Sequence, residues 1–199
     1  MNTKKPILIV IAGPNGSGKT SITHKILKHE WVENCIYINP DEIARDEFGD
    51  WNSREAIINA AHLAEEIRES CIKNKQSLIF ETVLSATDKL HFIQKAKENG
   101  YFIRLFFVST DSPIINASRI AQRVMNGGHD VPITKIISRY SKSIANCCLA
   151  IGLVDRSYIY DNSLEFKEPT LLFRVSGKKI TKKYSIINNW AKPIFDECL

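Results

Sequence analysis

A glycine-rich octapeptide near the start of the chain has the composition and spacing of a phosphate-binding loop. Residues 13–20 read GPNGSGKT, which completes the pattern GxxxxGK[ST] between an apolar run and a helical pattern. In such a loop the glycines let backbone N–H groups turn towards phosphate oxygens, Lys19 neutralises the β- and γ-phosphates, and Thr20 offers its hydroxyl to Mg²⁺. The alternative is a glycine-rich turn without a ligand. The residues predicted to bind ATP here are Gly13, Pro14, Asn15, Gly16, Ser17, Gly18, Lys19 and Thr20.

A carboxylate follows the second apolar run of the chain, where residues 39–42 read NPDE. Pro40 should end a strand, which leaves Asp41 at the same sheet edge as the glycine-rich loop. Transfer of a phosphoryl group to an alcohol needs a carboxylate within hydrogen-bond reach of that hydroxyl. Asp41 is therefore a candidate general base. The alternative is that Asp41 caps a helix whose first turn holds Glu42.

The third apolar run ends in the sequence IFET, residues 79–82. The chain has no Walker B aspartate, and Glu81 is the acidic residue that follows the run beside the predicted phosphate loop. Glu81 could orient a magnesium-bound water or hold a substrate hydroxyl. The alternative is a strand-end residue that faces solvent.

Arginines cluster in the third quarter of the chain. Residues 101–150 carry six basic and two acidic side chains, although the formal charge of the whole chain is only +5. Arg119 and Arg123 lie four residues apart, hence on one helix face, and a glycine break separates them from Arg139 on the next helix. This arrangement predicts a lid over ATP at about residues 119–132, which supplies positive charge to the phosphoryl group. A solvated pair of surface helices is the alternative.

The elements that must position these residues alternate between apolar runs and helical patterns. The runs, most of which lack the period-two polarity of a half-exposed sheet, predict strands at 7–12, 35–38, 77–80, 101–108 and 158–160. Helices are predicted after the glycine-rich loop, over 53–73 and 89–99, from a cap at Ser112 with Pro113 in the first turn, and from near Pro132. This alternation predicts an α/β fold with a doubly wound, mostly parallel sheet, a P-loop kinase fold with a helical lid. Its ligands should bind at the carboxyl ends of the strands.

Length and composition predict one domain over residues 1–199, with an appended segment at about 164–199 read as strand, turn and helix. The longest apolar run has six residues, far short of the ~20 that span a bilayer. We therefore expect a cytoplasmic protein without a membrane partner.

The localised positive charge favours an anionic small ligand over a nucleic-acid footprint. The five cysteines contain no CxxC pair, and we expect no protein-bound zinc site.

Together these motifs resemble the zeta-toxin family of P-loop kinases. The features that carry the resemblance occur in the family's order over roughly residues 7 to 165. They are GPNGSGKT, the NPD after the second strand, the ET after the third, the stretch RVMNGGHDVP, and the YDNS that begins at Tyr160.

The resemblance implies Mg²⁺-dependent transfer of phosphate from ATP to the sugar 3′-hydroxyl of UDP-N-acetylglucosamine, often with a small antitoxin that blocks the ATP site. By motif position it implies phosphate-loop roles for Lys19 and Thr20 and the role of base for Asp41. It further implies that Glu81 contacts the substrate hydroxyl and that Arg123 contacts phosphate. Arg119 and Arg139 are further candidate ATP contacts.

Two other functions remain open on the sequence. One is a kinase of the same architecture that phosphorylates another hydroxyl, on a nucleoside, an antibiotic or a polynucleotide end. The other is a nucleotide-binding regulatory ATPase that uses hydrolysis as a switch. Asp41 argues against the switch, because a switch needs a residue that positions water but no base for a bound alcohol.

Overall fold

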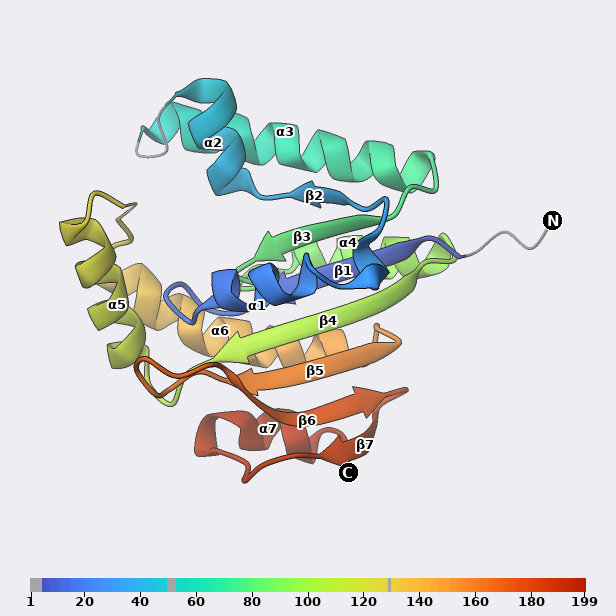
Figure 1. Ribbon diagram of the computed structural model, residues 1–199. Helices are drawn as coiled ribbons and strands as arrows, with labels where there is room; N and C mark the ends of the chain where they lie inside the picture. The colour runs from blue at the N-terminus through green and yellow to red at the C-terminus, as the bar shows by residue number, and fades with distance from the viewer. Residues whose placement is uncertain (1–4, 50–52, 129) are drawn as a thin grey trace.

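The computed structural model describes residues 5–49, 53–128 and 130–199, and within these residues the strands form a single sheet (Figure 1). Across the sheet their order is β2-β3-β1-β4-β5-β6-β7. Strands β1 to β5 are parallel, whereas β6 and β7 are antiparallel to their neighbours. The strands are β1 (Ile7–Ala12), β2 (Ile36–Ile38), β3 (Leu78–Thr82), β4 (Phe102–Ser109), β5 (Arg156–Asp161), β6 (Thr170–Ser176) and β7 (Lys179–Lys183).

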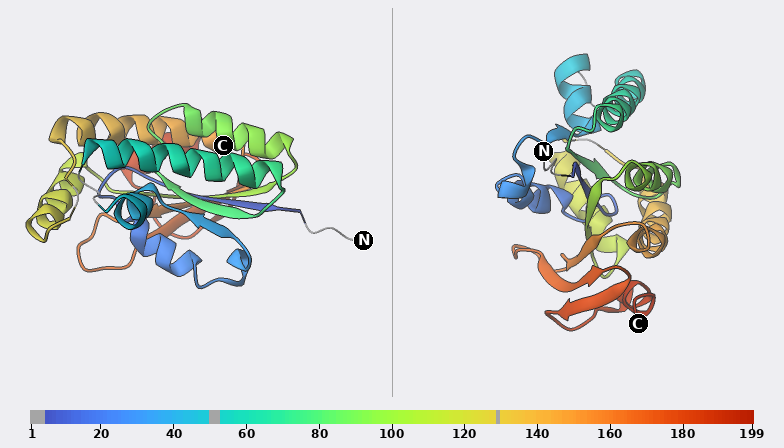
Figure 2. Two further views of the ribbon diagram at one scale, coloured as in Figure 1. Left: turned by 90° about the horizontal axis from the view of Figure 1, so that it is seen from above. Right: turned by 90° about the vertical axis from the view of Figure 1, so that its right-hand side faces the viewer.

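Helices cover both faces of the sheet, as the sequence predicts for a doubly wound fold (Figure 2). Ser53 and Ser112 cap α3 and α5 by accepting backbone N–H bonds, which confirms these two predicted helix starts. The α-helices are α1 (Lys19–Ile26), α2 (Pro40–Phe48), α3 (Arg54–Lys73), α4 (Asp88–Glu98), α5 (Pro113–Met125), α6 (Ile133–Ile151) and α7 (Lys192–Asp196). Two 3₁₀ turns, η1 (Glu30–Val32) and η2 (Asn189–Ala191), complete the described elements.

The central strand β1 shows why the fold has two apolar layers. Its residues from Leu8 to Ala12 are fully buried, and alternate side chains point to opposite faces. Leu8 and Val10 pack in the layer that contains α3, α4 and α6 side chains, while Ile9 and Ile11 pack against Ile22 of α1. The carboxyl end of β1 is thereby fixed between the two helical layers.

The α/β fold with a mostly parallel sheet is confirmed, and two differences from the prediction affect the site and the extent of the sheet. Strand β3 continues to Thr82, so Glu81 lies inside the strand and pairs in register with Ile11 of β1. Strand β7 was not predicted: the segment at about 164–199 was expected to hold one strand, a turn and a helix, but the chain forms a β6–β7 hairpin first.

The hairpin extends the sheet beyond β5, so the segment after residue 164 is part of the same sheet. Its edge strand β7 has the sequence KITKK, and exposed lysines are a common protection of edge strands against pairing with other chains. Trp190 and Ile194 pack in the apolar layer behind β5 and β6. No helix in the described part of the chain is long and apolar enough to cross a membrane.

Candidate active site

The glycine-rich loop joins the carboxyl end of β1 to the N-terminus of α1. Two of its glycines have left-handed backbones and close neighbours. Gly18 has a φ of +91°, and a Cβ there would lie 2.1 Å from Nδ2 of Asn162; at Gly16, with a φ of +76°, a Cβ would lie 2.5 Å from the Asn116 carbonyl oxygen. Only glycine fits both positions without displacing the neighbours.

Two asparagines from distant parts of the chain fasten this loop. Asn116 of α5 donates its side-chain N–H to the carbonyl of Asn15 at 2.8 Å, and Asn162 donates to the carbonyl of Ser17 at 2.9 Å. These bonds turn two loop carbonyls towards the asparagines and so fix the conformation of the glycine-rich loop. No motif in the sequence indicated a role for Asn116. Asn162 belongs to the YDNS motif that begins at Tyr160, but no role was predicted for it.

Lys19 lies at the centre of the charged groups. Its Nζ donates to the carbonyls of Gly13 and Pro14 at 2.9 and 3.1 Å. Burial lowers the pKa of the Lys19 ammonium from its ordinary value, and the charges of Arg123 and Arg139 add to the lowering. The carboxylates of Glu81 and Asp41 oppose it.

The charges of four predicted site residues therefore act on the Lys19 ammonium. These residues are Asp41, Glu81, Arg123 and Arg139. They come from α2, β3, α5 and α6. A phosphate group in the loop would stabilise the protonated form of Lys19, because an anion favours the charged form of an ammonium.

Glu81 is held by two hydroxyl groups. Its Oε1 accepts hydrogen bonds from Thr23 of α1 at 2.6 Å and from Tyr37 of β2 at 2.8 Å. Burial, with the adjacent charge of Glu81, raises the pKa of Tyr37, which keeps the phenol a donor. The alternative of a strand-end residue facing solvent is wrong, because Glu81 is half-buried and positioned. Thr23 and Tyr37 carried no signal in the sequence.

Asp41 lies in the first turn of α2, with an exposed side chain. The alternative that Asp41 caps the helix is wrong, since Asn39 is the cap and its Oδ1 accepts from the Asp41 N–H at 3.0 Å. Asn39 also donates to Tyr37 at 3.0 Å. The start of α2 is thus connected through Tyr37 to Glu81, and the Asp41 side chain is exposed to solvent.

The three arginines of the basic quarter have different surroundings. Arg139 donates to Oδ1 of Asn15 in the glycine-rich loop at 3.3 Å. Arg123 is exposed near the end of α5 and acts electrostatically on Lys19. Arg119 instead donates to the carbonyl of Leu164 at 3.4 Å. The structure therefore brings Arg123 and Arg139 to the loop and directs Arg119 towards the chain after β5.

Helix α5 stands beyond the carboxyl ends of the parallel strands, whereas α6 runs along one face of the sheet (Figure 1). They pack on each other through Ile120, Val131 and Ile136. At the end of α5, Gly127 takes a φ of +81° and the N–H of Gly128 donates to the Arg123 carbonyl at 2.9 Å, a glycine-terminated helix end. The predicted lid, 119–132, covers the second half of α5 and the connection to α6; residue 129 lies outside the described residues.

The residues present fit a magnesium ion that is held mainly by phosphates and water. Among the described residues no group of three or more His, Cys, Asp or Glu side chains could hold a metal ion by itself. Thr20 is exposed in the first turn of α1, directly after Lys19. Mg²⁺ in phosphoryl-transfer sites commonly keeps several waters and takes one or two protein ligands beside the phosphates, so one hydroxyl at this place suits it.

Comparison with known proteins gives matches in sequence and in fold. The sequence pattern of the family described as zeta toxin matches residues 1–164. An uncharacterized protein of Haemophilus influenzae is 31% identical over 132 residues, which cover 66% of this chain and 91% of that protein.

Two solved structures share the fold at low sequence identity. The first, from the PezAT chromosomal toxin-antitoxin system of Streptococcus pneumoniae, is 18% identical and has a TM-score of 0.64, with 100% of this chain and 86% of that chain covered. The second, AvrRxo1-ORF1:-ORF2 with ATP, is also 18% identical and has a TM-score of 0.71, with 99% and 64% covered.

Proposed function

This chain is a member of the zeta toxin family, and from that membership we propose that it is a kinase that transfers the γ-phosphoryl group of ATP to an alcohol. The proposed acceptor is the 3′-hydroxyl of UDP-N-acetylglucosamine. The observation that carries the proposal is the convergence of Asp41, Glu81, Arg123 and Arg139 on Lys19 at the carboxyl edge of the sheet. That group combines cations for the phosphates with carboxylates for a hydroxyl.

In the proposed reaction the acceptor oxygen attacks the γ-phosphorus as its proton passes to the Asp41 carboxylate, and ADP leaves. Lys19 and the loop N–H groups bind the phosphates, and Glu81, held by two hydroxyl donors, accepts a hydrogen bond from the acceptor. Mg²⁺ would be held by Thr20 and the phosphates and would supply positive charge at the β- and γ-phosphates.

We also propose an antitoxin protein as a partner. The support is the family membership and the likeness to a structure from a toxin-antitoxin system.

The proposed acceptor is tested by incubating the protein with ATP, Mg²⁺ and a panel of hydroxyl compounds. The panel contains UDP-N-acetylglucosamine, free N-acetylglucosamine, a nucleoside, an aminoglycoside and an oligonucleotide with a 5′-hydroxyl. Mass spectrometry should find one added phosphate on the sugar nucleotide and on no other compound. Phosphate on a different member would replace the proposed acceptor. ADP formed at the same rate with and without every acceptor would favour the regulatory ATPase.

Loss of Arg123 should lower the rate of phosphoryl transfer, whereas loss of Arg119 should lower the stability of the fold. We expect Arg123→Ala to lower kcat by about tenfold to a hundredfold, the size of one charged hydrogen bond to the reacting phosphates. Arg119→Ala should leave kcat within about twofold and lower the melting temperature, because Arg119 ties α5 to Leu164. Steady-state kinetics with thermal melts check this. Equal effects of the two substitutions on kcat would contradict the separate roles.

A further inference from the structure

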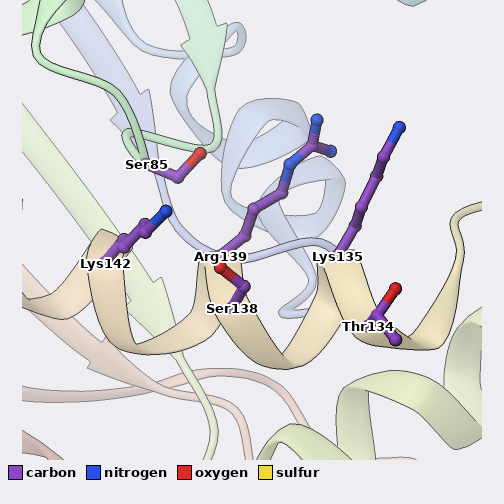
Figure 3. Close-up of a pocket in the computed structure, with 6 residues that line it drawn as sticks. All are labelled: Ser85, Thr134, Lys135, Ser138, Arg139 and Lys142. Carbon is purple, nitrogen blue, oxygen red and sulfur yellow. The ribbon is translucent and has the colours of Figure 1, made fainter.

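A cavity of about 280 Å³ lies between α6 and the loop that follows β3 (Figure 3). In Figure 3 the side chains of Lys135, Arg139 and Lys142 leave α6 on the same side, and Ser85 stands across from them on the loop. Among the described residues the lining contains three cations, three hydroxyl groups and no carboxylate: Ser85, Thr134, Lys135, Ser138, Arg139 and Lys142. The chemistry of this lining suits an anion with several acceptor oxygens.

The placement of the cations is unfavourable for the helix itself. Lys135, Arg139 and Lys142 follow each other at spacings of four and three residues, so like charges are neighbours on one face of α6. Lys135 also lies in the first turn, where the helix dipole disfavours a positive charge, and that turn contains no acidic residue. Neither lysine belongs to an ion pair within the described residues. A bound anion would relieve both repulsions.

The opposite wall of the cavity is fixed to α6. Ser143 donates to the carbonyl of Val83 at 2.6 Å, and Asn146 donates to the carbonyl of Leu84 at 2.9 Å. Leu84 is buried and takes a left-handed backbone with a φ of +57°, which its N–H bond to Thr82 supports. A buried leucine in that conformation persists only where its surroundings enforce it. The loop therefore presents Ser85 at a defined place opposite the cations.

The cavity adjoins the phosphate loop through Arg139. This residue lines the cavity and also donates to Asn15 at 3.3 Å. The loop that carries Ser85 begins directly after Glu81 and Thr82, at the end of β3. An anion in the cavity would thus lie at the same sheet edge as Lys19.

We propose that this cavity binds a phosphate group of the acceptor, which deepens the proposed kinase function and rests on it. Lys135 and Lys142 neutralise the phosphate, and the hydroxyls of Ser85 and Ser138 donate hydrogen bonds to its oxygens. The site selects acceptors that already carry phosphate, such as a nucleoside-diphosphate sugar. It disfavours neutral sugars, and it repels cationic antibiotics.

The first experiment measures the binding of inorganic pyrophosphate by calorimetry, with a non-hydrolysable ATP analogue present at saturation so that the glycine-rich loop is filled. Lys135→Ala and Lys142→Ala should each weaken pyrophosphate binding by about tenfold, the size of one lost charged contact. Lys97→Ala is the matched control, since it removes an exposed lysine from α4, and it should bind as the unchanged protein does. The double variant, which combines Lys135→Ala with Lys142→Ala, should melt at the same or a higher temperature, because it removes like-charge repulsion.

The second experiment compares UDP-N-acetylglucosamine with free N-acetylglucosamine as acceptors. The double variant should raise KM for the sugar nucleotide by at least tenfold with kcat and the KM for ATP unchanged, and the free sugar should receive no phosphate from either protein. Pyrophosphate binding that is lost in the double variant together with an unchanged KM would show that the cavity holds a free anion and would overturn the acceptor role.

Pyrophosphate binding that is equal in all variants, or absent from the unchanged protein, would overturn the anion site altogether. A lack of transfer to every acceptor would instead count against the proposed function, and the calorimetric comparison would still decide whether the cavity binds phosphate.

Discussion

Replacing Lys19 by alanine should abolish measurable phosphoryl transfer while the protein remains folded. Lys19 is the residue on which the other charged groups of the site act, and its ammonium already lies over the loop carbonyls of Gly13 and Pro14. In the proposed reaction it stabilises negative charge on the β- and γ-phosphates, and a preorganised cation in a partly buried site contributes strongly to such stabilisation. Alanine leaves this place without a positive charge.

The fold should survive the change because Lys19 contributes little to it. Its Nζ donates to two backbone carbonyls, and a cation in the first turn of a helix is unfavourable to the helix dipole. Transfer assays, ATP binding by calorimetry and a thermal melt measure the three properties separately. Lys25→Ala is the matched control on the same helix, because Lys25 pairs with exposed Glu168 away from the loop. Turnover by Lys19→Ala at the rate of the unchanged protein would show that this loop is not the ATP site.

Asp41→Asn should reduce phosphoryl transfer by roughly 10² to 10⁴-fold and leave ATP binding nearly unchanged, which is the range for loss of a general base. Asparagine keeps the shape of the side chain but cannot accept the proton of the acceptor hydroxyl. The helix should keep its start, because the cap is Asn39 and the bond from the Asp41 backbone N–H does not involve the carboxylate. Single-turnover rates with bound ATP isolate the chemical step.

Asp46→Asn provides the comparison on the same helix. Asp46 is exposed and pairs with the neighbouring Arg45, so its loss should affect transfer less than twofold. A variant Asp41→Asn that is fully active and only melts at a lower temperature would leave Asp41 the role of an acidic residue at a helix N-terminus. The base would then have to be sought elsewhere, with Glu81 as the first residue to replace.

The phosphate loop, the order of strands and helices apart from α2 and β7, and the position of three carboxyl-end motifs follow from the sequence alone. These features depend on contacts between near neighbours: a glycine pattern sets the turn of residues 13–20, apolar β-branched runs set buried strands, and Ser53 and Ser112 set helix starts. A parallel sheet then brings the ends of β1, β2 and β3 to one edge. Lys19, Asp41 and Glu81 could for that reason be selected together.

The partners of those residues were decided by the tertiary structure. Asn116, Asn162 and Tyr37 are ordinary polar residues in their own segments, and only the packing of α5, the end of β5 and β2 around the first strand places them on the loop or on Glu81. The same holds for β7, whose KITKK sequence has too little apolar character to predict a strand until β6 provides its pairing partner. Arg119 and Arg123 share a helix face, yet a contact with Leu164 separates their surroundings. Local patterns determine backbone conformation, whereas the assignment of a polar side chain to a partner depends on distances between segments that only the folded chain brings together.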